Sequence, residues 1–440
     1  VNATVYGTAD DGETVTATID GKSASATAKD GQFLIKLPEH KAGGPYTLTV
    51  KGKTTVTLKN VLYGDIWLAG GQSNMAFKLL SIQRQKQHMA RLAELAKNTN
   101  VRILLMPIKA GSKVEADIPV SQWIVNGAEG YNKVSAAGYV FGAELAAHLK
   151  VPVAIIHCNK GGSAVEPWMS KEALKKQGIG AGRTWYNAMV GPMLKFPIRG
   201  VVWYQGESNG GSVAKATRYG KTFPAMIQSW RDEWKNPNMT FLFVQLAGYA
   251  KDSVKVATNW PVLRESQNKA LALPKTGVAL AIDIGAGGIH PGKKFPLGIR
   301  LFLAARAIEY GEDIVYSGPM YKSMTVKGGK AVLTFNHVGS GMIIRDGDPE
   351  GEIVLGETLK GFVICGADKK FIPAQAKIVG NTVVVSHPSI KTPVAVRYAW
   401  TSWPEANLYN KENLPASPFR TDTFVIAEAP KPVRKPRPAK

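Results

Sequence analysis

The 440-residue sequence predicts a three-layer α/β/α domain flanked by two β domains. Three observations lead to this fold class. Short strands separated by glycine-rich turns occupy the start of the chain, apolar strands alternate with amphipathic helices in the middle, and strands return near the end. A chain of this length also exceeds what one hydrophobic core usually serves, so several domains are expected.

Residues 1–60 are predicted to form a small β-sandwich module. The runs TVTATID, SASATA, QFLIKL and YTLTV have the composition of strands, and the turns DDG, KDG and AGG separate them.

Residues 61–315 are predicted to form the α/β domain. The apolar runs IWLAG, VRILLMPI, VAIIHC, VVWYQG, FLFVQLAG and VALAIDIG alternate with helical stretches such as AAGYVFGAELAAHLK and FPLGIRLFLAARAIEYG. Near-continuous apolar strands that alternate with amphipathic helices are typical of a parallel sheet covered on both faces.

Residues 316–426 turn to strands again, with KAVLTFNHV, GFVICG, NTVVVSH and VAVRYAW among them, and predict a C-terminal β domain. Residues 427–440 end in KPVRKPRPAK, a basic Pro-rich tail whose composition does not support a packed core.

Composition excludes several classes of function. The net charge of +22 is spread along the chain without a zinc-finger or RNA-binding motif, so no nucleic-acid partner is expected, although a basic nucleic-acid-associated protein remains a rival. The sequence contains no run of eighteen apolar residues, so no membrane span is predicted. Two cysteines and the lack of metal-ligand spacing predict neither a metal site nor a cofactor.

Ser73 is the candidate nucleophile. In IWLAGGQSNM it follows an apolar strand and two glycines, and SNMAFKLL is suited to begin a helix. A serine at a strand-to-helix turn exposes its hydroxyl beside backbone N–H groups that stabilise an oxyanion. The alternative is that Ser73 only caps the helix. The G-x-S-x-G elbow of α/β-hydrolases is absent.

Three further loops carry polar or glycine residues directly after candidate strands. They contain Gly161 and Gly162, then Gln205, Glu207 and Asn209, and finally Asp283 and His290. Ligands bind at the carboxyl ends of strands in open α/β sheets, so these loops are expected to meet Ser73.

The blocks GQSNM, WYQGESN and IHP, in this order, resemble those of the SGNH hydrolases, and within them the sialate O-acetylesterase family of carbohydrate esterases. AGGPYTLTV, YNAMVGPM, LRESQ and LPASPFRTD extend the resemblance over nearly the whole chain. It implies a flavodoxin-like catalytic domain with accessory β domains that hydrolyses O-acetyl esters on sialic acid or on plant and microbial glycans. The expected protein is bacterial and secreted or periplasmic, and its signal peptide is absent from this sequence, which begins VNATVYGTAD.

The resemblance also implies roles for individual residues. Ser73 is expected to be the nucleophile and His290 its base. The oxyanion hole is expected to combine the Ser73 N–H, an N–H of the Gly161–Gly162 loop, and the amide of Gln205 or, second, of Asn209. Side chains expected to line the sugar site are Gln72, Glu207, Trp168, Asn187 and Arg264, although Trp168 also fits core packing and Glu207 also fits a brace for its loop.

The third member of the triad is open at this level. Many bacterial relatives carry Asp two residues before the catalytic His, whereas this chain has Gly288 there. Asp283 is the nearest upstream acid and the preferred candidate, and a main-chain carbonyl is the alternative. Because this chain has Gly288 at that position, one alternative is a glycan-binding protein that keeps the esterase fold but has lost catalysis. A second alternative is an acetyl xylan or xyloglucan esterase.

Overall fold

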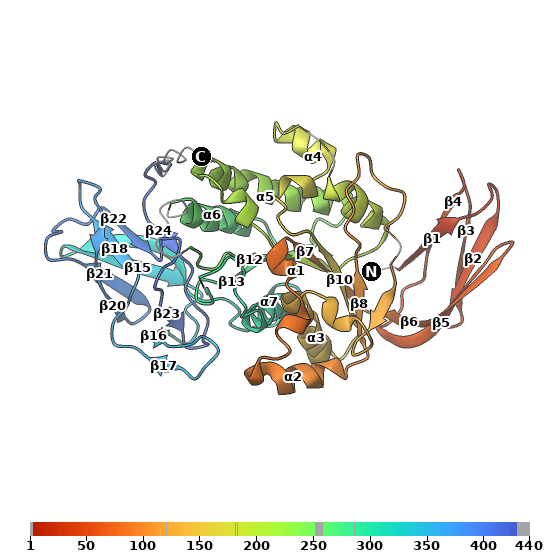
Figure 1. Cartoon of the computed structure of the whole chain (residues 1–440), viewed down its shortest axis with the longest axis horizontal. Coiled ribbons are helices and arrows are strands. Elements are labelled where there is room, and N and C mark those ends of the chain that lie inside the picture. The colour runs from red at the N-terminus through yellow and green to blue at the C-terminus, as the bar shows by residue number, and fades with distance from the viewer. Residues whose placement is uncertain are drawn as a thin grey trace, which may run out of the picture.

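The computed structural model describes residues 3–119, 121–180, 182, 184–250, 258–285 and 287–428. Three parts lie in a row, with an N-terminal β unit at one end, a central α/β unit, and a C-terminal β unit at the other end (Figure 1). The predicted basic tail lies outside the described residues from 429 onward.

The N-terminal unit is an antiparallel β structure. Its strands are β1 (Thr4–Thr8), β2 (Thr14–Ile19), β3 (Lys22–Thr27), β4 (Gln32–Lys36), β5 (Gly43–Lys51) and β6 (Thr55–Tyr63). They form a four-stranded sheet in the order β3-β2-β5-β6 and a separate β1-β4 pair. Alternate residues of β2, Val15, Ala17 and Ile19, point into a small core with Ile35 and Leu48, as expected for a strand with one buried face.

The central sheet has seven strands in the order β13-β12-β11-β7-β10-β8-β9. Their bounds are β7 (Asp65–Gly71), β8 (Val101–Leu105), β9 (Trp123–Val125), β10 (Val153–Asn159), β11 (Gly200–Tyr204), β12 (Thr240–Gln245) and β13 (Thr276–Leu280). The predicted parallel sheet is confirmed for six of them, whereas β9 pairs antiparallel with β8 at the edge. β11 is buried throughout, which explains its unbroken apolar sequence.

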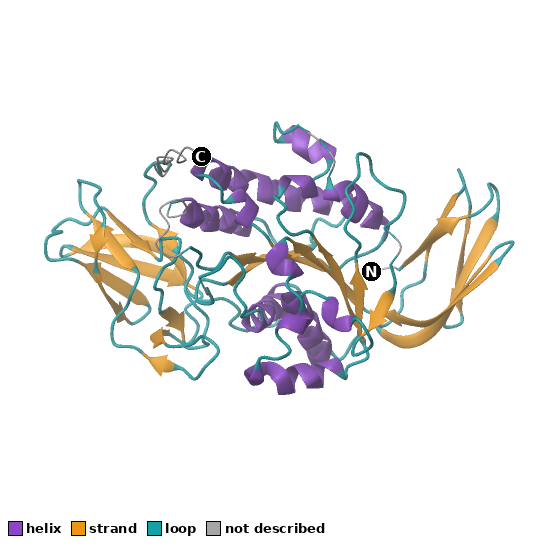
Figure 2. Ribbon diagram, viewed as in Figure 1, coloured by secondary structure: helices purple, strands orange, loops and turns teal. Residues whose placement is uncertain are grey.

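Helices cover both faces of this sheet (Figure 2). On one side lie α1 (Ser73–Ala76), α2 (Lys86–Ala96), α3 (Ala136–Leu149) and α7 (Phe295–Ile308), and on the other α4 (Lys171–Lys176), α5 (Val213–Glu233) and α6 (Asn259–Asn268). α3 and α7 pack closely because Gly298 leaves room for Val140. Short 3-10 or π turns are η1 (Leu79–Ser81), η2 (Tyr131–Lys133), η3 (Glu166–Trp168), η4 (Tyr186–Val190), η5 (Gly191–Lys195), η6 (Glu207–Asn209) and η8 (Lys269–Ala272).

The C-terminal unit contains three small antiparallel sheets, β14-β15-β21-β20, β17-β16-β23 and β19-β18-β22-β24. The strands are β14 (Met320–Lys327), β15 (Lys330–Asn336), β16 (Met342–Asp346), β17 (Val354–Leu355), β18 (Phe362–Cys365), β19 (Ile372–Pro373), β20 (Gln375–Val379), β21 (Thr382–Ser386), β22 (Ala395–Tyr398), β23 (Leu408–Asn410) and β24 (Phe419–Arg420). Phe362, Tyr398 and Phe419 form an aromatic cluster in its core.

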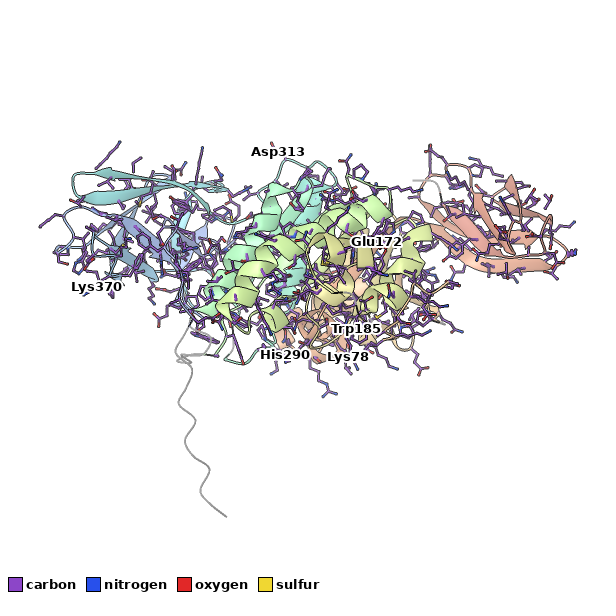
Figure 3. All side chains as sticks on the ribbon, turned by 90° about the horizontal axis from the view of Figure 1, so that it is seen from above. Lys78, Glu172, Trp185, His290, Asp313 and Lys370 are labelled. Atoms are coloured by element: carbon purple, nitrogen blue, oxygen red, sulfur yellow. The ribbon has the colours of Figure 1, made fainter. Side chains whose placement is uncertain are left out.

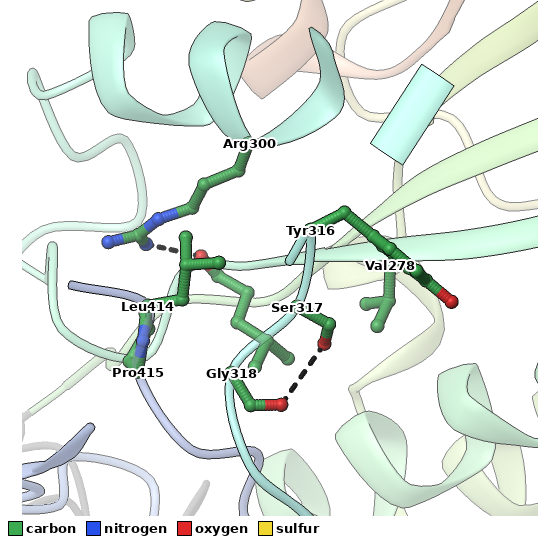
Figure 4. Close-up of a pocket in the computed structure, with 8 residues that line it drawn as sticks. Val278, Arg300, Tyr316, Ser317, Gly318, Leu414 and Pro415 are labelled. Atoms are coloured by element: carbon green, nitrogen blue, oxygen red, sulfur yellow. Dashed lines mark hydrogen bonds between the residues drawn. The ribbon is translucent and has the colours of Figure 1, made fainter. Parts of the chain in front are cut away.

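The C-terminal unit packs tightly against the β13 edge of the central sheet. Ile282, just after β13, belongs to the C-terminal core. A void of about 10 Å³ remains at this junction, lined by Val278 and Arg300 on one side and Gly318, Leu414 and Pro415 on the other (Figure 4). A side chain at Gly318 would collide with the main chain of Pro415, so glycine allows this close approach.

Two properties of the described residues bear on function. None of their helices combines the length and the apolarity needed to cross a bilayer. Within the same residues, no three His, Cys, Asp or Glu side chains gather as a metal site would require.

Candidate active site

The β7–α1 turn presents Ser73 at the carboxyl edge of the central sheet. Gly71 has a φ of 135°, and a Cβ there would collide with the Tyr204 carbonyl, so glycine is required at this position. The Gln72 N–H donates to the same Tyr204 carbonyl at 3.0 Å. Ser73 is the first residue of α1, and the N-cap is Gln72, so Ser73 is not the helix cap.

His290 lies against Ser73, although 217 residues separate them in the sequence. The imidazole Nε2 is 2.8 Å from the Ser73 Oγ. Partial burial lowers the pKa of His290 below its usual 6.5, and the positive charge of Lys294 adds to this effect. The imidazole is therefore neutral near pH 7 and able to accept the serine proton.

The Gly161–Gly162 loop after β10 also reaches Ser73. A Cβ built on Gly161 would lie 3.7 Å from the Ser73 Cβ, and Gly162 has a φ of 71°. Between the described residues, the N–H groups of Ser73, Gly161 and Gly162 find no acceptor. Backbone N–H groups without an acceptor, on the nucleophile turn and on a loop that reaches it, are suited to stabilise a developing oxyanion.

Asp283 does not join this group. Its carboxylate accepts hydrogen bonds from Arg300 Nη1 and Nη2 at 2.7 and 2.6 Å, and from the Tyr409 hydroxyl at 3.0 Å. No hydrogen bond connects it to His290 within the described residues. This placement corrects the expectation that Asp283 orients the imidazole, because the buried Arg300 guanidinium requires a buried counter-charge.

We therefore expect Asp283→Asn to affect stability more than catalysis. The substitution leaves the Arg300 charge buried without its partner and should lower the free energy of unfolding by about 3–5 kcal/mol. The kcat should fall less than about tenfold, because only a remote charge is lost. Denaturant unfolding and steady-state kinetics measure the two effects. Tyr409→Phe is the matched control, since it removes one hydrogen bond to Asp283 and no charge. A loss of 10²-fold or more in kcat with unchanged stability would restore Asp283 as the acid of a triad.

Comparison with known proteins identifies the family to which the chain belongs. Residues 63–291 match the family described as carbohydrate esterase, sialic acid-specific acetylesterase. The chain belongs to this family. It is 30% identical to the sialate O-acetylesterases of Homo sapiens and Pongo abelii, over 95% of this chain and 88% of each of theirs. A carbohydrate acetylesterase from Xanthomonas citri is 40% identical in sequence, and its crystal structure superposes with a TM-score of 0.87 over 96% of this chain and 95% of that one.

The family resemblance seen in the sequence is thus confirmed, and with it the fold class and the assignment as an esterase of sugar acetyl esters. The predicted domain boundaries at residues 60 and 315 stay a prediction.

The Gln205 amide is bonded to neighbouring loops rather than free for an oxyanion. Its amide Nε2 donates to Asn209 Oδ1 at 2.8 Å and to Gln72 Oε1 and the Ser163 carbonyl at 3.2 Å each. The side chain is completely buried, and both amide protons are used by these acceptors. This corrects the choice of Gln205 as an oxyanion donor. Asn209 Nδ2 donates to Glu166 at 3.1 Å, so its amide is fixed in one orientation.

The side chains predicted to line the sugar site are buried in the esterase and support its loops instead. These are Gln72, Glu207, Trp168, Asn187 and Arg264. Trp168 is 0% exposed and donates from Nε1 to Ser163 Oγ at 2.9 Å, which corrects its assignment to the sugar site. Asn187 holds the Gly111 carbonyl at 3.1 Å. Gln72 Oε1 accepts from the Ser208 N–H at 3.2 Å.

Arg264 joins two units of the esterase. It is fully buried, and its guanidinium donates at 2.8–2.9 Å to the carbonyls of Leu246, Ala247, Thr401 and Ser402. Burial lowers its pKa to about 9. The sugar-binding role expected for Arg264 is therefore corrected to a bridge between the loop after β12 and the C-terminal unit.

The sequence did not predict a polar cluster of Asn74, Glu207 and Lys294 next to the Ser73–His290 pair. Asn74 Nδ2 donates to Glu207 Oε1 and, at 2.8 Å, to the Ile289 carbonyl, and Asn74 Oδ1 accepts from Lys294 Nζ at 2.5 Å. The available signal was position alone, since Asn74 follows the nucleophile in GQSNM and Lys294 ends the block IHPGKK.

Sequence reasoning also missed an aromatic and basic surface beside the nucleophile. The Lys160 ammonium donates to the Gly161 carbonyl at 2.9 Å and lies 5.6 Å from the centroid of the Trp185 ring. In Figure 3, Trp185, Lys78 and His290 lie along one edge of the central unit.

Proposed function

We propose that the esterase releases acetate from O-acetylated sugars through an acetyl-Ser73 intermediate. The observation that carries the proposal is the 2.8 Å contact between His290 Nε2 and Ser73 Oγ at the carboxyl edge of the sheet. The N–H groups of Ser73, Gly161 and Gly162, which have no acceptor among the described residues, support it as oxyanion donors. Asn209 is a weaker candidate for a fourth donor, because its Nδ2 donates to both Glu166 carboxylate oxygens at 3.1 and 3.2 Å.

In the proposed acylation step, His290 Nε2 takes the Ser73 hydroxyl proton while Oγ attacks the acetyl carbonyl. The tetrahedral intermediate collapses when the imidazolium gives this proton to the departing sugar oxygen. Water then attacks the acetyl-enzyme with His290 again as base, and collapse releases acetate and regenerates Ser73. With Asp283 occupied by Arg300, we propose a Ser–His pair whose imidazole is oriented by main-chain groups.

For the substrate, we propose an O-acetylated sialic acid. The named activity of the mammalian relatives and the net charge of +22 favour an acidic sugar. Lys160 and Trp185 beside Gly161 supply a cation and an aromatic face for such a ligand. The second candidate is a neutral acetylated polysaccharide such as xylan or xyloglucan, since the Xanthomonas citri relative, at 40% identity, is described only as a carbohydrate acetylesterase and fits either substrate.

Acetate release from a panel of substrates tests this function. We expect kcat/KM on O-acetylated sialic acids to exceed that on acetylated xylan or xyloglucan by about tenfold or more, since a site with a suited cation discriminates against substrates that lack its partner. Ser73→Ala supplies the enzymatic blank. Faster release from xylan or xyloglucan would overturn the sialate assignment, and glycan binding without acetate release from any substrate would indicate a retired scaffold.

A further inference from the structure

A fully buried lysine lies next to the candidate catalytic pair, at a position where a lysine lowers the stability of the fold. Lys294 is 0% exposed, and its ammonium lies 5.1 and 5.0 Å from the ring centroids of Phe77 and Tyr204. It also occupies the N-cap position of α7, without a side-chain cap hydrogen bond. Helix starts favour small polar acceptors and negative charge, so a lysine there costs stability.

The hydrogen bonds of Lys294 determine which way the Asn74 amide points. In its charged form Lys294 only donates, so it selects the Oδ1 side of Asn74, at 2.5 Å. The amide nitrogen must then face the two acceptors on its other side, the Glu207 carboxylate and the Ile289 carbonyl. In this orientation of the Asn74 amide, all three partners form hydrogen bonds. If the amide were flipped, its nitrogen would face the Lys294 donor and its oxygen would face the two acceptors.

The Ile289 carbonyl connects this cluster to the base. It belongs to the peptide unit that leads directly into His290, whose Nε2 contacts Ser73. Asn74, in turn, follows Ser73 directly on α1. One side chain therefore joins the main chains that carry the two reacting groups, and its orientation depends on Lys294.

We propose that Lys294 is a positioning residue of the hydrolytic reaction: it locks Asn74 so that Asn74 holds the Ile289 carbonyl and, through it, His290 against Ser73. This rests on the proposed role of the Ser73–His290 pair. It supplies the orienting contact that Asp283 does not provide.

The charge of Lys294 acts on the same base. The titratable groups facing it among the described residues are Glu207 from η6, Tyr204 from β11 and His290 from its own loop. Burial lowers the pKa of Lys294 to about 7, although Glu207 opposes this effect. Lys294 is thus charged over the acidic range in which His290 titrates, and it helps to keep the imidazole neutral there.

The test compares Lys294→Met, Lys294→Gln and Lys293→Met. Methionine retains the apolar stem and removes both charge and donor, whereas glutamine removes the charge and keeps a neutral donor. Lys293→Met is the matched control, because it neutralises the adjacent lysine, which pairs with Asp348 outside the cluster. The readouts are kcat and KM for acetate release, the pH profile of kcat/KM, and thermal unfolding.

We expect Lys294→Met to lower kcat about 10²-fold with little change in KM, since a small displacement of an aligned base has this effect. Lys294→Gln should recover part of this loss. In both variants the acidic limb of the profile should move to higher pH, because the pKa of His290 rises when a nearby positive charge is removed. Lys293→Met should keep the wild-type kcat and limb.

Several outcomes would overturn the inference. The first is a kcat of Lys294→Met within about threefold of the Lys293→Met control. The second is a folded Lys294→Gln whose pH profile of kcat/KM has the same acidic limb as the wild type. The third is a Lys293→Met variant whose kcat and acidic limb change as much as those of the Lys294 variants. If Lys294→Met does not fold, Lys294→Gln decides alone. A wild-type enzyme without acetate release would instead refute the proposed function, so the two failures are distinguishable.

Discussion

Ser73→Ala should lower kcat for acetate release by about 10⁴-fold or more and leave KM similar, because the hydroxyl forms a bond to the substrate only during reaction. An organophosphate reagent should label the wild-type chain at Ser73 alone, where His290 Nε2 lies 2.8 Å from the hydroxyl. Mass spectrometry of the labelled peptide and steady-state kinetics measure the two effects.

Ser229→Ala is a matched control for this experiment. The Ser229 hydroxyl donates to Glu233 at 2.8 Å on α5, so its loss should alter neither the labelling nor kcat. Retained activity in Ser73→Ala, with label on another serine, would contradict the proposed nucleophile.

His290→Ala should lower kcat to about the same extent, on the order of 10⁴-fold, because the serine then lacks a base. The two residues act as one unit, so the double variant Ser73→Ala/His290→Ala should be no slower than either single variant. The residual rate should come from the oxyanion donors and substrate binding. Kinetics of the three variants on one acetylated substrate give this cycle.

His148→Gln serves as the control for His290→Ala, since His148 is a surface histidine paired with Glu312 at 2.7 Å. Additive losses in the double variant would show that Ser73 and His290 act independently, which the proposed mechanism does not allow.

Local sequence patterns predicted what depends on local physics. Strand and helix periodicity in the central domain predicted a covered parallel sheet, because burial on both faces demands unbroken apolar strands such as β11. The meeting of Ser73 and His290 was also foreseeable, since the loops after parallel strands gather at one edge of the sheet. The edge strand β9, only three residues long, was missed because it lacks a clear period.

The partners of buried polar side chains could not be predicted in this way. Asp283 was judged by its distance along the chain from His290, but its oxygens are taken by Arg300 and Tyr409, 17 and 126 residues away. Arg264 lies in the family-matching stretch LRESQ, and Trp168 follows the glycine loop after β10, yet both are completely buried and support loops.

The sequence by itself thus determined the layers of the fold, the family, and the pair Ser73 and His290 as candidates. Only the tertiary structure decided that Asp283 neutralises Arg300, that the Gln205 amide donates to three neighbouring acceptors, and that Lys294 holds the Asn74 amide. The physical reason is desolvation. A buried charge or amide must find its partners within about 3 Å, and side chains that packing brings together from distant segments supply them.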